Sequence, residues 1–289
     1  MVALARAVLG RARRNRPQPG PVPTLQVFTG RRFQRLTLLP RLGWEPHWST
    51  APASPVLKRV RHGPRALAIE LGRGPVIVEA FELRDCRLSN SHIAPSNDPL
   101  HRSTVRRGSL SGCVLEFASP TAIFEDLEIQ DLRTTDPVTF SGCAFRHVRL
   151  RGAIGSILVR PWTGSGPRAP AQDALAERFR RENERYYRGV DWALDISEAV
   201  FAECELRDIP AHLVRRNPAH HFLVKRSKVL DGSWRTRPIK DTYFELALAG
   251  MMKEDTTERI LVAPMRSRDQ ARLLAALQDL RESGIAEPG

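Results

Sequence analysis

Apolar and small residues recur every five positions through the middle of the chain. Counting in fives from Val76 gives a first column, and counting from Val78 gives a second column two residues later. The first column of this block contains Val76, Phe81, Cys86 and Ser91, and the second contains Val78, Leu83, Leu88 and Ile93. A helix would return an apolar residue about every 3.6 positions and a simple strand about every 2.0, so neither standard period fits.

The same spacing returns in four more blocks, which begin at Gly108, Ala122, Val138 and Leu194. Residues two apart in an extended segment face the same side, so each apolar pair predicts a short extended step with one buried face. Sequences such as Ser111-Gly112 lie between the steps, where polar residues and glycine favour turns. The pattern therefore predicts a chain that winds into a coil with both columns inside.

The blocks AFELRDCRLSNSHI, SLSGCVLEF, AIFEDLEIQDL, TFSGCAFRHVRL and LDISEAVFAECELRDI resemble the pentapeptide-repeat proteins. The likeness covers about 80 to 100 residues in degenerate form, with shifts of phase and an interruption between residues 155 and 194. It implies a mainly β fold: a short, right-handed, quadrilateral β-helix of about four to five coils. It also implies a role in binding, because characterised members of that family mostly act by binding.

The chain divides into three parts on this interpretation. Residues 1–57 form a basic, Pro/Arg-rich N-terminal arm, residues 58–211 form the β-helix with a helical insertion at about 161–191, and residues 212–289 form a small α/β cap. The last coil of a β-helix has unpaired backbone groups, so we expect the C-terminal region to cover them.

Two of these parts carry helix and strand signals of their own. The insertion predicts a helix over roughly 171–188 that packs on the side of the coil, or alternatively projects toward a partner. In the C-terminal region, HHFLVKR and ERILVAP predict short strands, and DTYFELALAGMM predicts a short helix. The segment SRDQARLLAALQDLRESG predicts a longer helix with Ser267 as its N-cap, Gly284 beyond its end, and a buried stripe of leucines.

Positive charge is concentrated at the N-terminus of the chain. The formal net charge is +13, and residues 1–75 hold 14 Lys and Arg against 2 Asp and Glu. This asymmetry predicts a polyanion or an acidic protein surface as the partner of the arm. The candidate partner-binding residues are Arg11, Arg13, Arg14, Arg16, Arg31, Arg32 and Arg35. A solvated arm without a partner and an Arg-rich organelle-targeting presequence are the alternatives.

The sequence contains no specific catalytic motif. All four cysteines, Cys86, Cys113, Cys143 and Cys204, fall in the first column, where a free cysteine acts as a small hydrophobe. No C-x-x-C, HExxH, GxSxG or Walker A sequence is present, and His212, His220 and His221 are most simply part of the cap. We therefore expect no catalytic or metal-binding residues and no cofactor.

Two functions are compatible with these observations. The first is a non-enzymatic scaffold that presents a β-helix face to a macromolecular partner, either a protein or a nucleic acid. The alternative is an enzyme whose site lies in the C-terminal region or in its groove with the inserted helix. Every apolar run is shorter than the roughly 18 residues of a membrane span, so we expect a cytoplasmic protein, or an organelle-targeted one.

Overall fold

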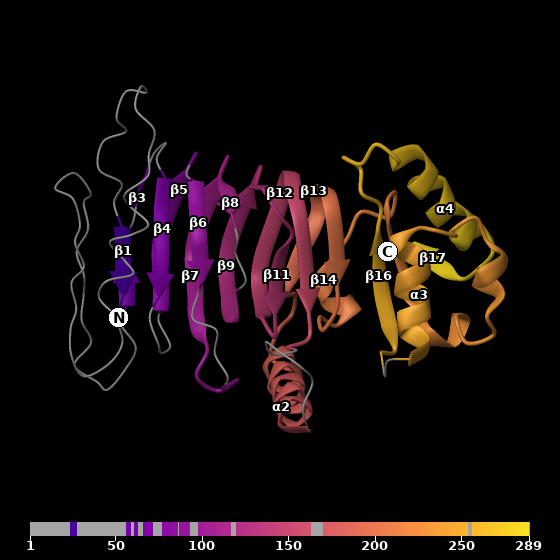
Figure 1. The fold of residues 1–289 in the computed structure, drawn as a ribbon, viewed down its shortest axis with the longest axis horizontal. Helices are drawn as coiled ribbons and strands as arrows, with labels where there is room; N and C mark the ends of the chain where they lie inside the picture. The colour runs from indigo at the N-terminus through magenta and orange to yellow at the C-terminus, as the bar shows by residue number, and fades with distance from the viewer. Residues whose placement is uncertain are drawn as a thin grey trace.

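A computed structural model of the chain has a mainly β architecture with a large mixed sheet, a smaller parallel sheet and three α-helices among the described residues. The strands follow one another along the long axis, and the C-terminal helices lie at one end (Figure 1). Cys86 and the seven candidate arginines of the arm lie outside the described residues. The structure describes residues 24–27, 56–58, 61–62, 66–71, 77–85, 87–92, 98–116, 120–162, 170–253 and 256–288.

Two sheets contain the strands of the described residues. The smaller sheet has five strands: β1 (Thr24–Val27), β4 (Ala66–Leu71), β6 (Arg87–His92), β8 (Val114–Glu116) and β10 (Arg133–Thr134). The larger sheet has 12 strands: β2 (Val56–Lys58), β3 (Arg61–His62), β5 (Ile77–Arg84), β7 (Ser103–Ser111), β9 (Ala122–Gln130), β11 (Val138–Ser141), β12 (Ala144–Arg160), β13 (Leu194–Leu206), β14 (Val214–Arg215), β15 (His221–Lys225), β16 (Glu258–Val262) and β17 (Ala286–Pro288).

Neighbouring strands in the middle of the larger sheet are parallel and follow chain order, from β5 through β7, β9 and β12 to β13. Ser103 of β7 pairs with Ala122 of β9, and Ile123 of β9 pairs with Ala144 of β12. In the smaller sheet, Val114 of β8 pairs with Arg133 of β10 at nearly the same separation along the chain. The β7–β9, β9–β12 and β8–β10 pairs therefore have similar separations along the chain, whereas the segment that contains α2 separates β12 from β13.

The two apolar columns supply the larger hydrophobic core, as the five-residue pattern predicts. Their buried members include Phe81, Leu83, Cys113, Ala122, Leu127, Leu132, Cys143, Val148, Leu194, Ala199, Phe201, Cys204 and Leu206. Members of one column also pair with each other in register: Leu127 of β9 pairs with Val148 of β12, and Val148 pairs with Leu194 of β13. The five-residue period therefore indicates which side chains pack on each other between successive strands.

The turn predicted at Gly112 and a second turn at Gly142 have a left-handed backbone. Their φ angles are +64° and +63°, a region that glycine enters without steric cost. Gly112 N–H donates to the Gln130 carbonyl at 3.0 Å, and Gly142 N–H donates to the Arg160 carbonyl at 3.0 Å. Each turn is therefore hydrogen-bonded to a later segment of the chain.

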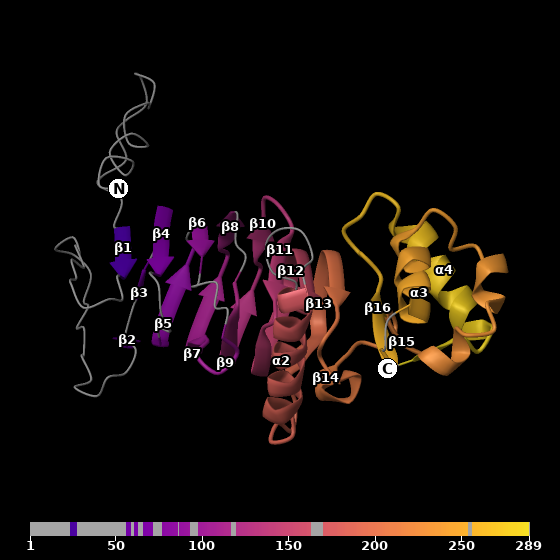
Figure 2. The same cartoon turned by 60° about the horizontal axis from the view of Figure 1, so that its bottom comes forward.

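Helix α2 (Pro170–Tyr187) leaves between β12 and β13 and lies against the side of the strands (Figures 1 and 2). Its buried face contains Phe179, Asn183 and Tyr187, and the Phe179 ring stacks on Trp162 at 5.3 Å. Asn183 Oδ1 accepts a hydrogen bond from the buried Arg102 guanidinium at 2.6 Å. The helix is thus held by both apolar and polar contacts.

The C-terminal region has its own core. Helices α3 (Tyr243–Lys253) and α4 (Gln270–Glu282) pack with β15 and β16 around a second cluster of buried residues. Strand β16 pairs antiparallel with the end of β13 through Leu206 and Ile260. The strands and helices predicted in this region are all present at or near the expected positions.

One detail of α4 differs from the prediction. The helix begins after Asp269, whereas the sequence predicts Ser267 as the N-cap. The Ser267 hydroxyl instead accepts a hydrogen bond from the Asp269 N–H at 3.1 Å, which forms a short turn before the helix. The predicted C-terminal glycine is confirmed, because Gly284 has a φ angle of +73° directly beyond the last turn.

Candidate interaction surface

A group of charged side chains gathers on the outer face of β9, β12 and β13. Glu128 of β9 pairs in register with Arg149 of β12, and Arg149 pairs with Asp195 of β13. Beyond a shift of register, Arg151 of β12 pairs with Glu198 of β13. Since residues two apart share a face, Arg149 and Arg151 point outward together. We call Glu128, Arg149, Arg151, Asp195 and Glu198 the charge ladder.

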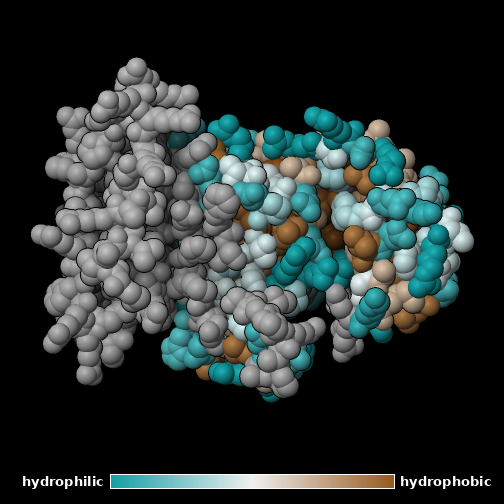
Figure 3. Space-filling view, in the orientation of Figure 1, coloured by the Kyte–Doolittle hydropathy of each residue, from teal (hydrophilic) through white to brown (hydrophobic). Residues whose placement is uncertain are grey.

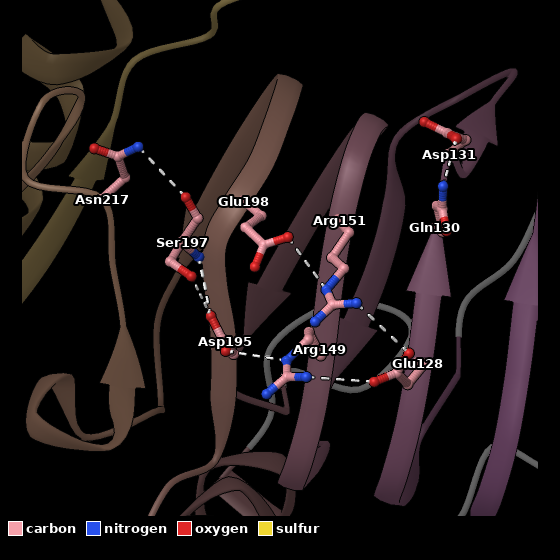
Figure 4. A network of polar contacts seen from close by, with 9 residues as sticks. All are labelled: Glu128, Gln130, Asp131, Arg149, Arg151, Asp195, Ser197, Glu198 and Asn217. Carbon is pink, nitrogen blue, oxygen red and sulfur yellow. Dashed lines mark hydrogen bonds and ion pairs between the residues drawn. The ribbon is translucent and has the colours of Figure 1, made fainter.

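The two arginines of the ladder lie between carboxylates on both sides (Figure 4). Arg149 Nε is 3.1 Å from Asp195 Oδ2, and Arg149 Nη1 is 3.4 Å from Glu128 Oε1. Arg151 Nε is 3.4 Å from Glu198 Oε2, and Arg151 Nη1 is 3.9 Å from Glu128 Oε2. Opposite charges on adjacent strands stabilise a sheet, whereas like charges would repel at this spacing. The ladder therefore compensates its own charges across three strands.

Exposure varies along the ladder. The side chains of Glu128 and Glu198 are 61% and 65% exposed, whereas Asp195 is 10% exposed. Burial opposes ionisation of Asp195, but hydrogen bonds from Ser197 and the contact with Arg149 outweigh it and hold the pKa of Asp195 below its usual value. Asp195 is therefore a fixed structural anion, while the two glutamates are available to solvent.

An aromatic side chain lies at one end of the ladder. The guanidinium carbon of Arg215 is 4.3 Å from the Trp192 ring centroid, and that of Arg149 is 5.8 Å away. His147 also contacts the ring at 4.8 Å between centroids, and its Nε2 lies 2.6 Å from the Asp191 carboxylate. Tryptophan and arginine are enriched where proteins bind other proteins. The exposed charged side chains of the ladder therefore lie beside a partly buried tryptophan.

The remaining candidates for chemistry have structural surroundings. Burial raises the pKa of the Cys143 thiol to about 12, and Cys113, Cys143 and Cys204 are all buried and unbridged. Asp231 accepts hydrogen bonds from the backbone and hydroxyl of Ser233 and so serves a local turn. Within the described part of the chain, no three His, Cys, Asp or Glu side chains are placed to hold a metal ion.

The ladder was not predicted from the sequence. The five-residue pattern identifies the positions between the apolar columns only as polar, although Glu128 and Arg149 have opposite charges and lie one strand-to-strand interval apart. This interval between opposite charges could have indicated that the two residues pair on neighbouring strands. The segment from Arg149 to Asp195 contains α2, so simple counting would have missed the third strand.

The comparisons with known proteins assign this chain to no family. No protein-family model matches the chain, and no curated protein or solved structure matches it significantly. None of the helices in the described residues is long and apolar enough to cross a membrane. The case for a function therefore depends on the geometry of the molecule.

Proposed function

We propose that this chain is a non-enzymatic scaffold protein that binds a macromolecular partner through the charge ladder. The observation that carries the proposal is the outer face of β9, β12 and β13, where exposed carboxylates and two arginines pair between strands beside Trp192. Such a surface combines preorganised charge with an aromatic contact, which favours specific binding.

We infer that the scaffold is a short, right-handed β-helix of the pentapeptide-repeat type. The similar separations of the β7–β9, β9–β12 and β8–β10 pairs support this, because four steps of the five-position pattern make one winding of that length. Left-handed turn residues recur at nearly the same spacing in Gly112, Asp131 and Gly152. A rigid column would hold the residues of the ladder in place without a ligand.

The C-terminal region fits the role of a cap on this column. Between its pairings with β14 and β16, the outer edge of β13 has backbone groups that no strand among the described residues satisfies. Asn217 Nδ2 donates to the Ser197 carbonyl at 3.4 Å, and Arg266 N–H donates to the Phe201 carbonyl at 3.2 Å. Covering such an edge prevents pairing with other chains.

The chemistry of the ladder favours a protein as its partner. It holds three acidic and two basic side chains, so it lacks the excess positive charge by which proteins bind the phosphate backbone. Hydrophobic residues form only small separate areas on the face shown in Figure 3, so no large apolar contact is expected on that face. The basic arm, with Arg11 to Arg35, is proposed to add attraction to an acidic surface or polyanion.

A recovery experiment from native extract tests this function. The full-length chain is compared with a variant in which Arg151→Glu and Glu198→Arg exchange the charges of one ladder pair. The control exchanges Lys225 and Glu287, an ion pair on the C-terminal region whose Nζ–Oε1 distance is 3.0 Å. We expect the ladder exchange to lower recovery of the partner about tenfold, and the control exchange to leave it unchanged.

Two further samples separate the arm from the ladder. One replaces all seven candidate arginines by glutamine in the full chain, and the other includes nuclease. The partner could be lost from both of these samples and still be recovered normally by the Arg151/Glu198 exchange variant. That result would place binding in the arm and contradict the proposal. Equal unfolding temperatures of the two exchange variants would show that folding does not explain the difference.

A further inference from the structure

The row of side chains that contains Glu128, Arg149 and Asp195 continues onto β14. Asp195 of β13 pairs in register with Arg149 of β12 on one side and with Arg215 of β14 on the other. Negative and positive side chains therefore alternate across four strands, in the order Glu128, Arg149, Asp195 and Arg215. Among the described residues β14 pairs only with β13, so no strand places an acid on the far side of Arg215.

Arg215 differs from the arginines of the charge ladder in what surrounds its guanidinium. Arg149 lies between two carboxylates, with Nε 3.1 Å from Asp195 Oδ2 and Nη1 3.4 Å from Glu128 Oε1. The other oxygen of Asp195 accepts from the Ser197 hydroxyl at 2.6 Å, so both of its oxygens already accept hydrogen bonds. Arg215 is exposed, and its guanidinium makes no ion pair or hydrogen bond within the described part of the chain. Its N–H donors are therefore open to a group from outside the chain.

Trp192 holds this guanidinium at a defined place. The guanidinium carbon of Arg215 lies 4.3 Å from the centroid of the Trp192 ring, within the range of cation–π attraction. Trp192 is itself held by β12, because its carbonyl accepts from the His147 N–H at 3.2 Å and its ring contacts the His147 ring at 4.8 Å between centroids. A planar guanidinium that already rests on a ring loses less freedom when it binds a ligand.

The donors of Arg215 match a carboxylate. A guanidinium presents its N–H donors in a planar fork that fits both oxygens of a carboxylate. An acid at this point would continue the alternation of the row and offset the repulsion between Arg149 and Arg215, whose guanidiniums lie over the same ring. One open guanidinium beside compensated charges suits a single carboxylate, whereas a nucleic-acid backbone is bound by several neighbouring cations.

We propose that Arg215 binds an aspartate or glutamate side chain of the protein partner. This inference rests on the proposed function, because Arg215 lies on the same outer face as the charge ladder and extends one of its rows. Arginine and tryptophan are enriched among the few residues that contribute most of the binding energy of an interface. Arg215 on Trp192 is therefore expected to be such a position.

The recovery experiment from native extract tests this inference when variants of Arg215 are added. Arg215→Gln removes the charge, and we expect it to lower recovery of the partner about tenfold. The matched control is Arg268→Gln, at an exposed arginine that also has no ion-pair partner among the described residues, and it should leave recovery unchanged. Equal unfolding temperatures of the two variants would show that folding does not explain the difference.

Carbodiimide coupling identifies the group that residue 215 meets. This reagent joins a lysine amine directly to a carboxylate in contact with it, so Arg215→Lys is treated with it in complex with the recovered partner. We expect mass spectrometry to find residue 215 joined to an aspartate or glutamate of the partner, and no such adduct from Arg268→Lys. Equal adducts from both lysines, or none from position 215 with the partner still bound, would overturn the inference.

The outcomes separate this inference from the proposed function. Normal recovery by Arg215→Gln, with a tenfold loss in the Arg151/Glu198 exchange variant, would overturn the inference and leave the proposed function in place. Normal recovery by both variants would contradict both. A partner that depends on Arg215 and is lost with nuclease would be a nucleic acid, which would also overturn the assignment of a carboxylate.

Discussion

The carboxylate of Asp131 occupies the space that a side chain at Gly152 would need. A Cβ atom at Gly152 would lie 2.3 Å from Asp131 Oδ1, and the same oxygen accepts a hydrogen bond from the Ala153 N–H at 2.9 Å. Both residues have a left-handed backbone, with φ angles of +52° for Asp131 and +67° for Gly152. Two successive turns of the chain are thus locked to each other.

Gly152→Ala is predicted to destabilise the protein by about 2 kcal/mol or more, because a Cβ would displace the carboxylate and strain the left-handed backbone. The free energy of unfolding in urea measures the effect. Gly189→Ala is the matched control, since nothing lies within 4 Å of a Cβ built there. Equal effects of the two variants would show that the contact between the two turns does not matter.

Cys143→Ala is predicted to cost about 1 kcal/mol more than Cys204→Ala. Cys143 Sγ donates to the Pro120 carbonyl at 3.2 Å and accepts from the Ala122 N–H at 3.4 Å, whereas no hydrogen bond of Cys204 Sγ is found among the described residues. Alanine removes the thiol acceptor of the Ala122 N–H and one of the two donors to the Pro120 carbonyl, which still accepts from the Ser141 N–H at 3.2 Å. Urea unfolding of the two variants measures the difference, and equal costs would show that volume alone determines the role of these thiols.

Asp208 is predicted to make stability fall as the pH rises from about 4 to about 6. Burial raises the pKa of Asp208 to about 6, despite the hydrogen bond from Asn183 Nδ2 at 2.8 Å. The folded state therefore holds a proton that the unfolded state has already released, and this advantage is lost as the pH passes the folded pKa.

Asp208→Asn checks the sign of that effect. Asparagine tolerates the left-handed backbone of this position, where φ is +65°, and its side-chain oxygen can still accept from Asn183. The variant should gain stability relative to the unmodified protein between pH 4 and pH 7, as measured by thermal unfolding across that range. A difference in unfolding temperature that stays constant across this pH range would contradict the raised pKa of Asp208 as the cause.

The core could be predicted from the sequence because burial imposes a period on the chain. Phe201 and Cys204 follow from counting in fives, and α4 follows from its buried leucines. The charge ladder could not, because it joins β12 to β13, and their separation along the chain depends on the segment that contains α2. The prediction of Ser267 as the N-cap is wrong because the Ser267 hydroxyl accepts from the Asp269 N–H in the turn that precedes the helix.

Site-specific photocrosslinking tests most directly whether the charge ladder binds the partner. A photoreactive residue is placed at Glu198, whose side chain is 65% exposed on the ladder, or at Glu282, which is exposed at the end of α4. Our account predicts a covalent adduct with the partner from position 198 and none from position 282. Adducts from position 282 alone, or in equal yield from both positions, would contradict it.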